Sequence, residues 1–140
     1  MKLKRGVVMI KKGVKDLVEE AEANIETMTV QEVIKIKDDN NTMLVDIRDI
    51  RELWRDGTIP NSIHAPRGML EFWVDPNSPY YREQFGSGKK IVFFCAGGLR
   101  SALAAFTVKK MGLEAVAHME GGYAKWVESG GTIEPKEPKF

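Results

Sequence analysis

The stretch from Ile91 to Ser101 constrains the fold of this chain more than any other part of the sequence. It opens with a continuous apolar run, Ile91–Phe94, which is typical of a strand buried on both faces of a parallel sheet. The run ends in Cys95, the single cysteine of the chain, and two glycines and Arg100 follow it. A helical pattern then begins at Ser101. The segment therefore predicts a strand, a tight loop and a helix N-terminus, with a thiol at the first position of the loop.

The rest of the sequence alternates short apolar runs with amphipathic helical patterns. Strands are expected at 43–47, within 59–66, at 91–94 and at 115–118, and helices at 14–25, 29–36, 49–56, 69–73, 102–111 and 123–128. Residues 75–88 are predicted to form a long surface loop. Capping-box patterns open the second and third of these helices. Strands that alternate with helices predict an α/β fold, with a parallel β-sheet and helices on both faces.

Length and charge narrow the classes of function. The 140 residues fit one domain, and 43% hydrophobic residues suffice for a core. A net charge of +1 argues against nucleic-acid or membrane partners. The N-terminal lysines and arginine are interpreted as a solvated flank, and the apolar run beside them is too short for a signal peptide or a membrane span. We therefore expect a cytoplasmic protein, which also suits a free thiol.

The thiol lies where an α/β sheet binds ligands, at the carboxyl end of a strand. Gly97 and Gly98 allow the loop amides to turn inward, and the helix beginning near Ser101 adds its positive dipole end. Arg100 adds a fixed positive charge. The first anion that these features stabilise is the thiolate of Cys95, so we expect a nucleophile. A buried structural cysteine is the alternative, but it gives no reason for the two glycines.

The length of the loop separates two chemistries. Four residues lie between Cys95 and Arg100, whereas protein tyrosine phosphatases carry five between their cysteine and arginine. A shorter loop makes a smaller cradle, which suits a sulfur atom on the cysteine more than a phosphoryl group. The segment Cys95–Ser101 resembles the active-site loop of the rhodanese family of sulfurtransferases.

Three further motifs carry the same resemblance, in the family's order. Residues 44–48 resemble the family's Val-Asp-Val-Arg strand, 57–63 its Gly-His-Ile-Pro-Gly-Ala motif, and 119–126 its Leu-x-Gly-Gly-x-x-x-Trp signature. Thr58 and Asn61 depart from the usual His and Gly. The chain is accordingly divided into an N-terminal amphipathic helical extension (1–28), a rhodanese-like domain (29–131) and a C-terminal tail (132–140).

The resemblance implies a rhodanese-like sheet and a two-step sulfur transfer. Cys95 would take a sulfane sulfur from thiosulfate or a persulfide and pass it to a thiol or cyanide, without a metal or organic cofactor. The loop amides would hold the persulfide; they belong to Ala96, Gly97, Gly98, Leu99, Arg100 and Ser101. Since the chain has no second cysteine, the sulfur must leave to an external acceptor. The expected partners are a small-molecule or protein sulfur donor and a thiol acceptor.

Several residues outside the loop carry two interpretations each. Asp46 either orients the loop or has a structural role, in a buried salt bridge or as a helix cap, and the resemblance to the family's Asp-x-Arg pattern favours the structural role. Arg48 either attracts anionic donors or belongs to that salt bridge, and Arg67 either faces the pocket or is solvated. One of Phe72 and Trp73 is expected in the core. Both histidines are interpreted as structural, and two of them are too few for a convincing metal cluster.

Other functions stay open from the sequence alone. The same fold would serve as a binding or redox-sensing module. A phosphatase or arsenate reductase is disfavoured by the loop length and by the lack of a resolving cysteine. The N-terminal helix either docks on the domain, forms a homodimer or engages a partner.

Overall fold

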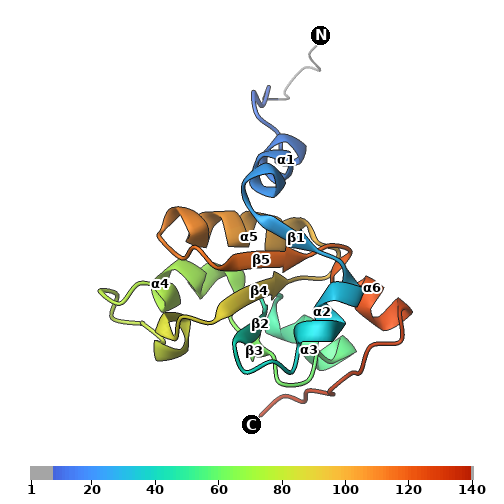
Figure 1. Ribbon diagram of the computed structural model, residues 1–140. Coiled ribbons are helices and arrows are strands. Elements are labelled where there is room, and N and C mark those ends of the chain that lie inside the picture. The colour runs from blue at the N-terminus through green and yellow to red at the C-terminus, as the bar shows by residue number, and fades with distance from the viewer. Residues whose placement is uncertain (1–7, 140) are drawn as a thin grey trace.

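Helices cover both faces of a parallel sheet, as Figure 1 shows. The computed structural model describes residues 8–139, so the N-terminal flank with Lys2, Lys4 and Arg5 lies outside the described residues. Helices α1 and α4 pack against α5 on one face, and α2 packs against α6 on the other. The predicted fold class is therefore confirmed.

The observed α-helices and strands follow the predicted order, with one added strand at the start, and two short 3-10 turns are added as well. The strands are β1 (Glu26–Met28), β2 (Thr42–Asp46), β3 (Ile63–His64), β4 (Lys90–Phe94) and β5 (Val116–Met119). The helices are α1 (Val14–Asn24), α2 (Val30–Ile36), α3 (Ile50–Asp56), α4 (Leu70–Val74), α5 (Leu99–Lys110) and α6 (Gly122–Glu128). Two short 3-10 turns are also present, η1 (Arg67–Met69) and η2 (Glu83–Gly86). Across residues 8–139, no helix has the length and apolar character that crossing a membrane requires.

All strand pairs are parallel, in the spatial order β1-β5-β4-β2-β3. In the register of the sheet, Asp46 of β2 lies beside Phe94 of β4, and His118 of β5 lies beside Phe93. The carboxyl ends of β2, β4 and β5 therefore meet at one edge, which is where the loop after β4 begins.

Strand β4 is buried on both sides, which explains its continuous apolar sequence. Its side chains alternate between the two faces, as a strand requires. Phe93 and Cys95 belong to the core cluster that includes residues of α4 and α5, whereas Val92 and Phe94 belong to the cluster around Trp126 of α6. The alternation therefore directs the thiol toward the α5 face.

Strand β1 was not predicted, because its three residues contain no apolar run. It is an edge strand that pairs with β5, with Thr27 opposite His118. The helix that precedes it, α1, packs its buried Val18 and Ala21 against Ala102 of α5. Its position is therefore set by tertiary contacts and not by local hydrophobicity.

The capping boxes are present as predicted. Glu32 closes the first through Thr29, and Glu52 closes the second by accepting a 3.0 Å hydrogen bond from the amide of Asp49. The amide of Gly57 donates to Leu53 at 2.8 Å and ends α3. Of the two aromatic residues of α4, Phe72 is half exposed and Trp73 packs against the core, as expected.

Candidate active site

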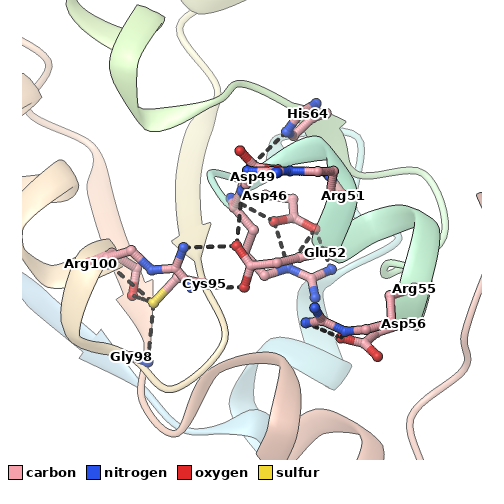
Figure 2. A network of polar contacts seen from close by, with 12 residues as sticks. Asp46, Asp49, Arg51, Glu52, Arg55, Asp56, His64, Cys95, Gly98 and Arg100 are labelled. Carbon is pink, nitrogen blue, oxygen red and sulfur yellow. Dashed lines mark hydrogen bonds and ion pairs between the residues drawn. The ribbon is translucent and has the colours of Figure 1, made fainter. Parts of the chain in front are cut away.

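Cys95 occupies the first position after β4, and its sulfur faces the backbone of the loop. The amides of Gly98 and Ser101 donate to Sγ at 3.1 and 3.4 Å; Figure 2 shows the first of these contacts. The residue is only 1% exposed. Two amides of the predicted cradle thus reach the sulfur, and both belong to the end of the loop where α5 begins.

Gly98 allows this geometry because it adopts a left-handed backbone conformation, with φ of 101°. An L-residue resists that conformation. A Cβ at this position would also lie 3.1 Å from the amide nitrogen of Gly121. The glycine lets the chain turn sharply into α5, which directs its own amide at Sγ.

The first turn of α6 fixes the other end of the loop. The amide of Tyr123 donates to the carbonyl of Cys95 at 2.7 Å, and that of Ala124 donates to the carbonyl of Ala96 at 3.0 Å. These bonds hold the first two loop carbonyls toward α6. The loop is therefore held by the first turn of α6, which begins at the family-like Gly-Gly segment 121–122, and not only by its own glycines.

A row of polar groups leads from the thiol into the protein. Sγ of Cys95 lies 3.6 Å from Oγ of Ser101, and that hydroxyl lies 3.0 Å from Nδ1 of His118. On the other side of the ring, Oε2 of Glu22 lies 3.4 Å from Nε2. Sequence reasoning treated His118 as structural and did not connect it with the loop. The available signal was its place at the carboxyl end of β5, beside β4.

Burial lowers the pKa of His118, which is 1% exposed, while the carboxylates of Glu22 and Glu120 act in the opposite direction. The ring is therefore neutral near pH 7. With its proton on Nε2, the ring accepts a hydrogen bond at Nδ1 from the Ser101 hydroxyl, whose oxygen can then accept a hydrogen bond from the thiol. The row therefore fixes the orientation of the Ser101 hydroxyl beside Cys95.

This pKa shift predicts a pH dependence of stability. Below the usual histidine pKa of 6.5, the unfolded chain binds a proton that the native state resists. The free energy of unfolding should therefore fall as the pH drops from 7.5 to 5.5, by at most about 1.4 kcal/mol per pH unit from this residue. Urea titrations across this range should show a smaller decline for His118→Gln, which keeps an acceptor for Ser101. An identical decline in both proteins would contradict the assignment.

Arg100 does not present a free guanidinium to the loop. Its Nη1 and Nη2 donate to the two carboxylate oxygens of Glu52 at 2.9 and 3.0 Å, in a bidentate pair that Figure 2 shows. Glu52 raises the pKa of Arg100, and Arg100 in turn lowers the pKa of Glu52. The charge predicted for the loop is present, but a carboxylate from α3 neutralises it.

Asp46 and Arg48 form a fully buried ion pair below the loop. Nη2 and Nε of Arg48 donate to Asp46 at 2.8 and 3.0 Å, and Nη2 also donates to the carbonyl of Gly57 at 2.7 Å. Thr58 donates its hydroxyl to Asp46 at 2.7 Å, which gives this departure from the family pattern a place in the network. The guanidinium also lies 4.2 Å from the ring centroid of Tyr123. This geometry agrees with the structural interpretation of both residues.

The remaining candidates lie outside the loop network. Arg67 pairs with Glu71 at 2.7 Å and approaches Oγ1 of Thr107 at 3.5 Å. Nε2 of His64 bonds to the carbonyl of Arg48 at 2.7 Å, a structural contact. Within residues 8–139, no group of three or more His, Cys, Asp or Glu side chains is placed to hold a metal ion.

Comparisons with known proteins match most of the chain to one domain family. The model of the rhodanese-like domain matches residues 29–129. A mouse (Mus musculus) protein, thiosulfate sulfurtransferase/rhodanese-like domain-containing protein 3, is 29% identical over 105 residues, which are 71% of this chain and 67% of that protein. A tRNA uridine(34) hydroxylase of Brucella ovis is 39% identical over 93 residues, 64% of this chain, and the match spans only 28% of the hydroxylase.

Solved structures give the same fold. A protein of unknown function from Rhodopseudomonas palustris, described as a possible tyrosine phosphatase, is 51% identical with a TM-score of 0.89; the match covers 91% of this chain and 98% of that one. The homodimeric polysulfide-sulfur transferase of Wolinella succinogenes is 28% identical with a TM-score of 0.67, and the match covers 87% of each chain.

Proposed function

The chain belongs to the rhodanese-like domain family, and on that premise we propose that it is a sulfurtransferase that carries a sulfane sulfur on Cys95. The observation that carries the proposal is the sulfur of Cys95, which accepts hydrogen bonds from Gly98 and Ser101 at the start of α5. Preorganised amides of this kind stabilise negative charge on a thiolate and on the outer sulfur of a persulfide. The sulfurtransferases among the relatives support the same chemistry.

In the proposed first step, the Cys95 thiolate attacks the outer sulfur of the donor. A bond forms between the two sulfurs and the donor's own bond to that sulfur breaks. Sulfite leaves when the donor is thiosulfate, and a thiolate leaves when it is a persulfide. In the second step, an acceptor thiolate or cyanide attacks the outer sulfur of the Cys95 persulfide and the Cys95 thiolate leaves. Both steps conserve charge and need no redox partner.

Ser101 has a positioning role in this scheme. Its hydroxyl lies 3.6 Å from Sγ and 3.0 Å from Nδ1 of the neutral His118 ring, so the hydrogen bond to the ring fixes the hydroxyl beside the sulfur. The Ser101 amide, at 3.4 Å from Sγ, stabilises negative charge on the sulfur.

Phosphoryl transfer is the second candidate, because the Rhodopseudomonas palustris protein is described as a possible tyrosine phosphatase. Two observations disfavour it. The loop has one residue fewer than the phosphatase pattern, and the Arg100 fork that would bind a phosphoryl group is held by Glu52. We do not propose the hydroxylase activity of the Brucella relatives for this chain, since the match spans only 28% of their length.

Intact-mass spectrometry tests the proposal directly. The full chain, incubated with thiosulfate or an alkyl persulfide, should gain one sulfur atom, and added cyanide should remove it as thiocyanate. Cys95→Ser should gain none, because the chain has no other cysteine. If the wild type gains no sulfur from either donor, the proposal is wrong. Hydrolysis of p-nitrophenyl phosphate that disappears in Cys95→Ser would favour the phosphatase.

A further inference from the structure

The bidentate pair between Arg100 and Glu52 determines what the loop accepts. Phosphate, thiosulfate and related oxyanions are bound best by an arginine whose paired N–H groups face the ligand. Here both of the terminal nitrogens of Arg100 donate to Glu52, at 2.9 and 3.0 Å. A dianionic donor would have to displace this carboxylate or approach a pair with no net charge.

Glu52 is held firmly in this place. Its carboxylate accepts a hydrogen bond from the amide of Asp49 at 3.0 Å, which closes the capping box of α3, and its side chain is only 18% exposed. Arg100 keeps the pKa of Glu52 below its usual value, so the carboxylate stays charged. The helix cap therefore places the carboxylate of Glu52 against Arg100 of the loop, as Figure 2 shows.

The other arginines predicted near this edge are also neutralised. Arg48 is buried against Asp46, and Arg67 is paired with Glu71. The hollow between α1 and the loop is lined mainly by apolar and acidic side chains, with one lysine: Val14, Lys15, Val18, Glu19, Glu22 and Leu99. Leu99, the first residue of α5, is 60% exposed. These surroundings favour an approaching group of low charge over a compact dianion.

We propose that Glu52 is a specificity-determining residue that disfavours dianionic donors such as thiosulfate and selects alkyl persulfides of low charge. The inference rests on the proposed sulfurtransferase function. The selected step is attack of the Cys95 thiolate on the outer sulfur of R–S–SH. The new S–S bond forms, the donor's S–S bond breaks, R–S⁻ leaves, and the proton stays on the outer sulfur of the Cys95 persulfide. No oxidant or reductant is needed.

The test compares two donors on the full chain in single-turnover loading, measured by intact mass. Thiosulfate is the dianionic probe, and 2-hydroxyethyl persulfide is the probe without a second charge. Glu52→Gln keeps an oxygen to accept from Asp49 but removes the charge. It should speed loading from thiosulfate about tenfold, the effect expected from one nearby, partly screened charge. Loading from the persulfide should change less than about twofold, because that donor has no oxyanion for Arg100 to bind.

Glu32→Gln is the matched control, since Glu32 closes the capping box of α2 in the same way, through Thr29. It should leave both loading rates as they are. A measurement on the wild type adds a test that needs no variant. The rate of loading from thiosulfate should depend weakly on salt concentration, because the Arg100–Glu52 pair offers the donor no net charge. A steep fall with salt in the wild type would contradict the proposal, whether or not the variant folds.

The outcomes separate the two proposals. If the wild type loads sulfur and Glu52→Gln leaves the ratio of the two rates unchanged, the role of Glu52 is wrong and the sulfurtransferase function stands. An equal rise in the loading rates from both donors would also contradict the role of Glu52 in specificity, because the substitution would then have changed the reactivity of the Cys95 thiolate and not the choice of donor. If the wild type loads from neither donor, the function fails and the specificity falls with it.

Discussion

Replacement of Arg48 by alanine is expected to lower the free energy of unfolding by about 3–5 kcal/mol, the cost of leaving one partner of a buried ion pair unpaired. Asp46 is fully buried, and the guanidinium of Arg48 donates to its carboxylate at 2.8, 3.0 and 3.3 Å. The same substitution removes the bond from Nη2 to the carbonyl of Gly57. Domains of this size are stable by only about 5–15 kcal/mol, so the loss is a large share of the total.

Urea denaturation followed by circular dichroism measures this loss. Arg51→Ala is the matched control, because Arg51 pairs with Asp49 on the surface, where its side chain is 79% exposed. Solvent screens such a pair, and its removal should leave the denaturation midpoint in place. Asp46→Ala in the Arg48→Ala background should cost less than in the wild type, since the unpaired charge is then gone. Equal midpoints for wild type and Arg48→Ala would show that the pair does not stabilise the fold.

The sequence was sufficient to predict most elements because their signals are local. The continuous apolar run 91–94 identified the central strand, and the capping boxes at Thr29 and Asp49 located two helix starts. Strand β1 lacked such a signal. Its three residues are extended because they follow α1, which packs on α5, and because β5 offers a free edge. An element held by tertiary pairing leaves little trace in local periodicity.

The site was predicted only as far as its residues lie in one segment. The loop 95–101 was recognised from its own sequence, whereas the groups that complete it come from elsewhere. Glu52 lies 48 positions before Arg100, and its capping-box role gave no hint of a second partner. His118 of β5 contacts Ser101 of the loop, and Glu22 of α1 lies against the other side of the His118 ring. Parallel strands gather their carboxyl ends at one edge, but which side chains meet there depends on packing.

The hydrogen bonds of Thr58 explain why this residue can replace the histidine of the family pattern. Thr58 stands where the family usually has a histidine, and its hydroxyl donates to Asp46 at 2.7 Å. It also lies 3.1 Å from the hydroxyl of Ser62. The substitution therefore keeps a hydrogen-bond donor beside the buried carboxylate, which a nonpolar residue would leave short of a partner.

Gly122→Ala is expected to reduce sulfur loading of Cys95 by about a hundredfold or more, because misplacement of a catalytic group by about 1 Å has effects of that size. Gly122 has a φ of 61°, which an L-residue resists. A Cβ there would lie 2.5 Å from the carbonyl oxygen of Cys95 and 2.6 Å from that of Ala96. Both neighbours are backbone atoms of the loop and cannot rotate away. The first turn of α6 or the loop must therefore shift.

The shift would break the contacts that hold the loop in register, in which Tyr123 and Ala124 donate to the same two carbonyls at 2.7 and 3.0 Å. The amides of Gly98 and Ser101 would then no longer converge on Sγ, and the thiolate would lose its stabilisation. The loading rate, measured by intact mass with the persulfide donor, reports this loss. Gly68→Ala is the matched control, since an added Cβ there meets nothing within 4 Å. A Gly122→Ala variant that loads sulfur at the wild-type rate would show that α6 does not position the catalytic loop.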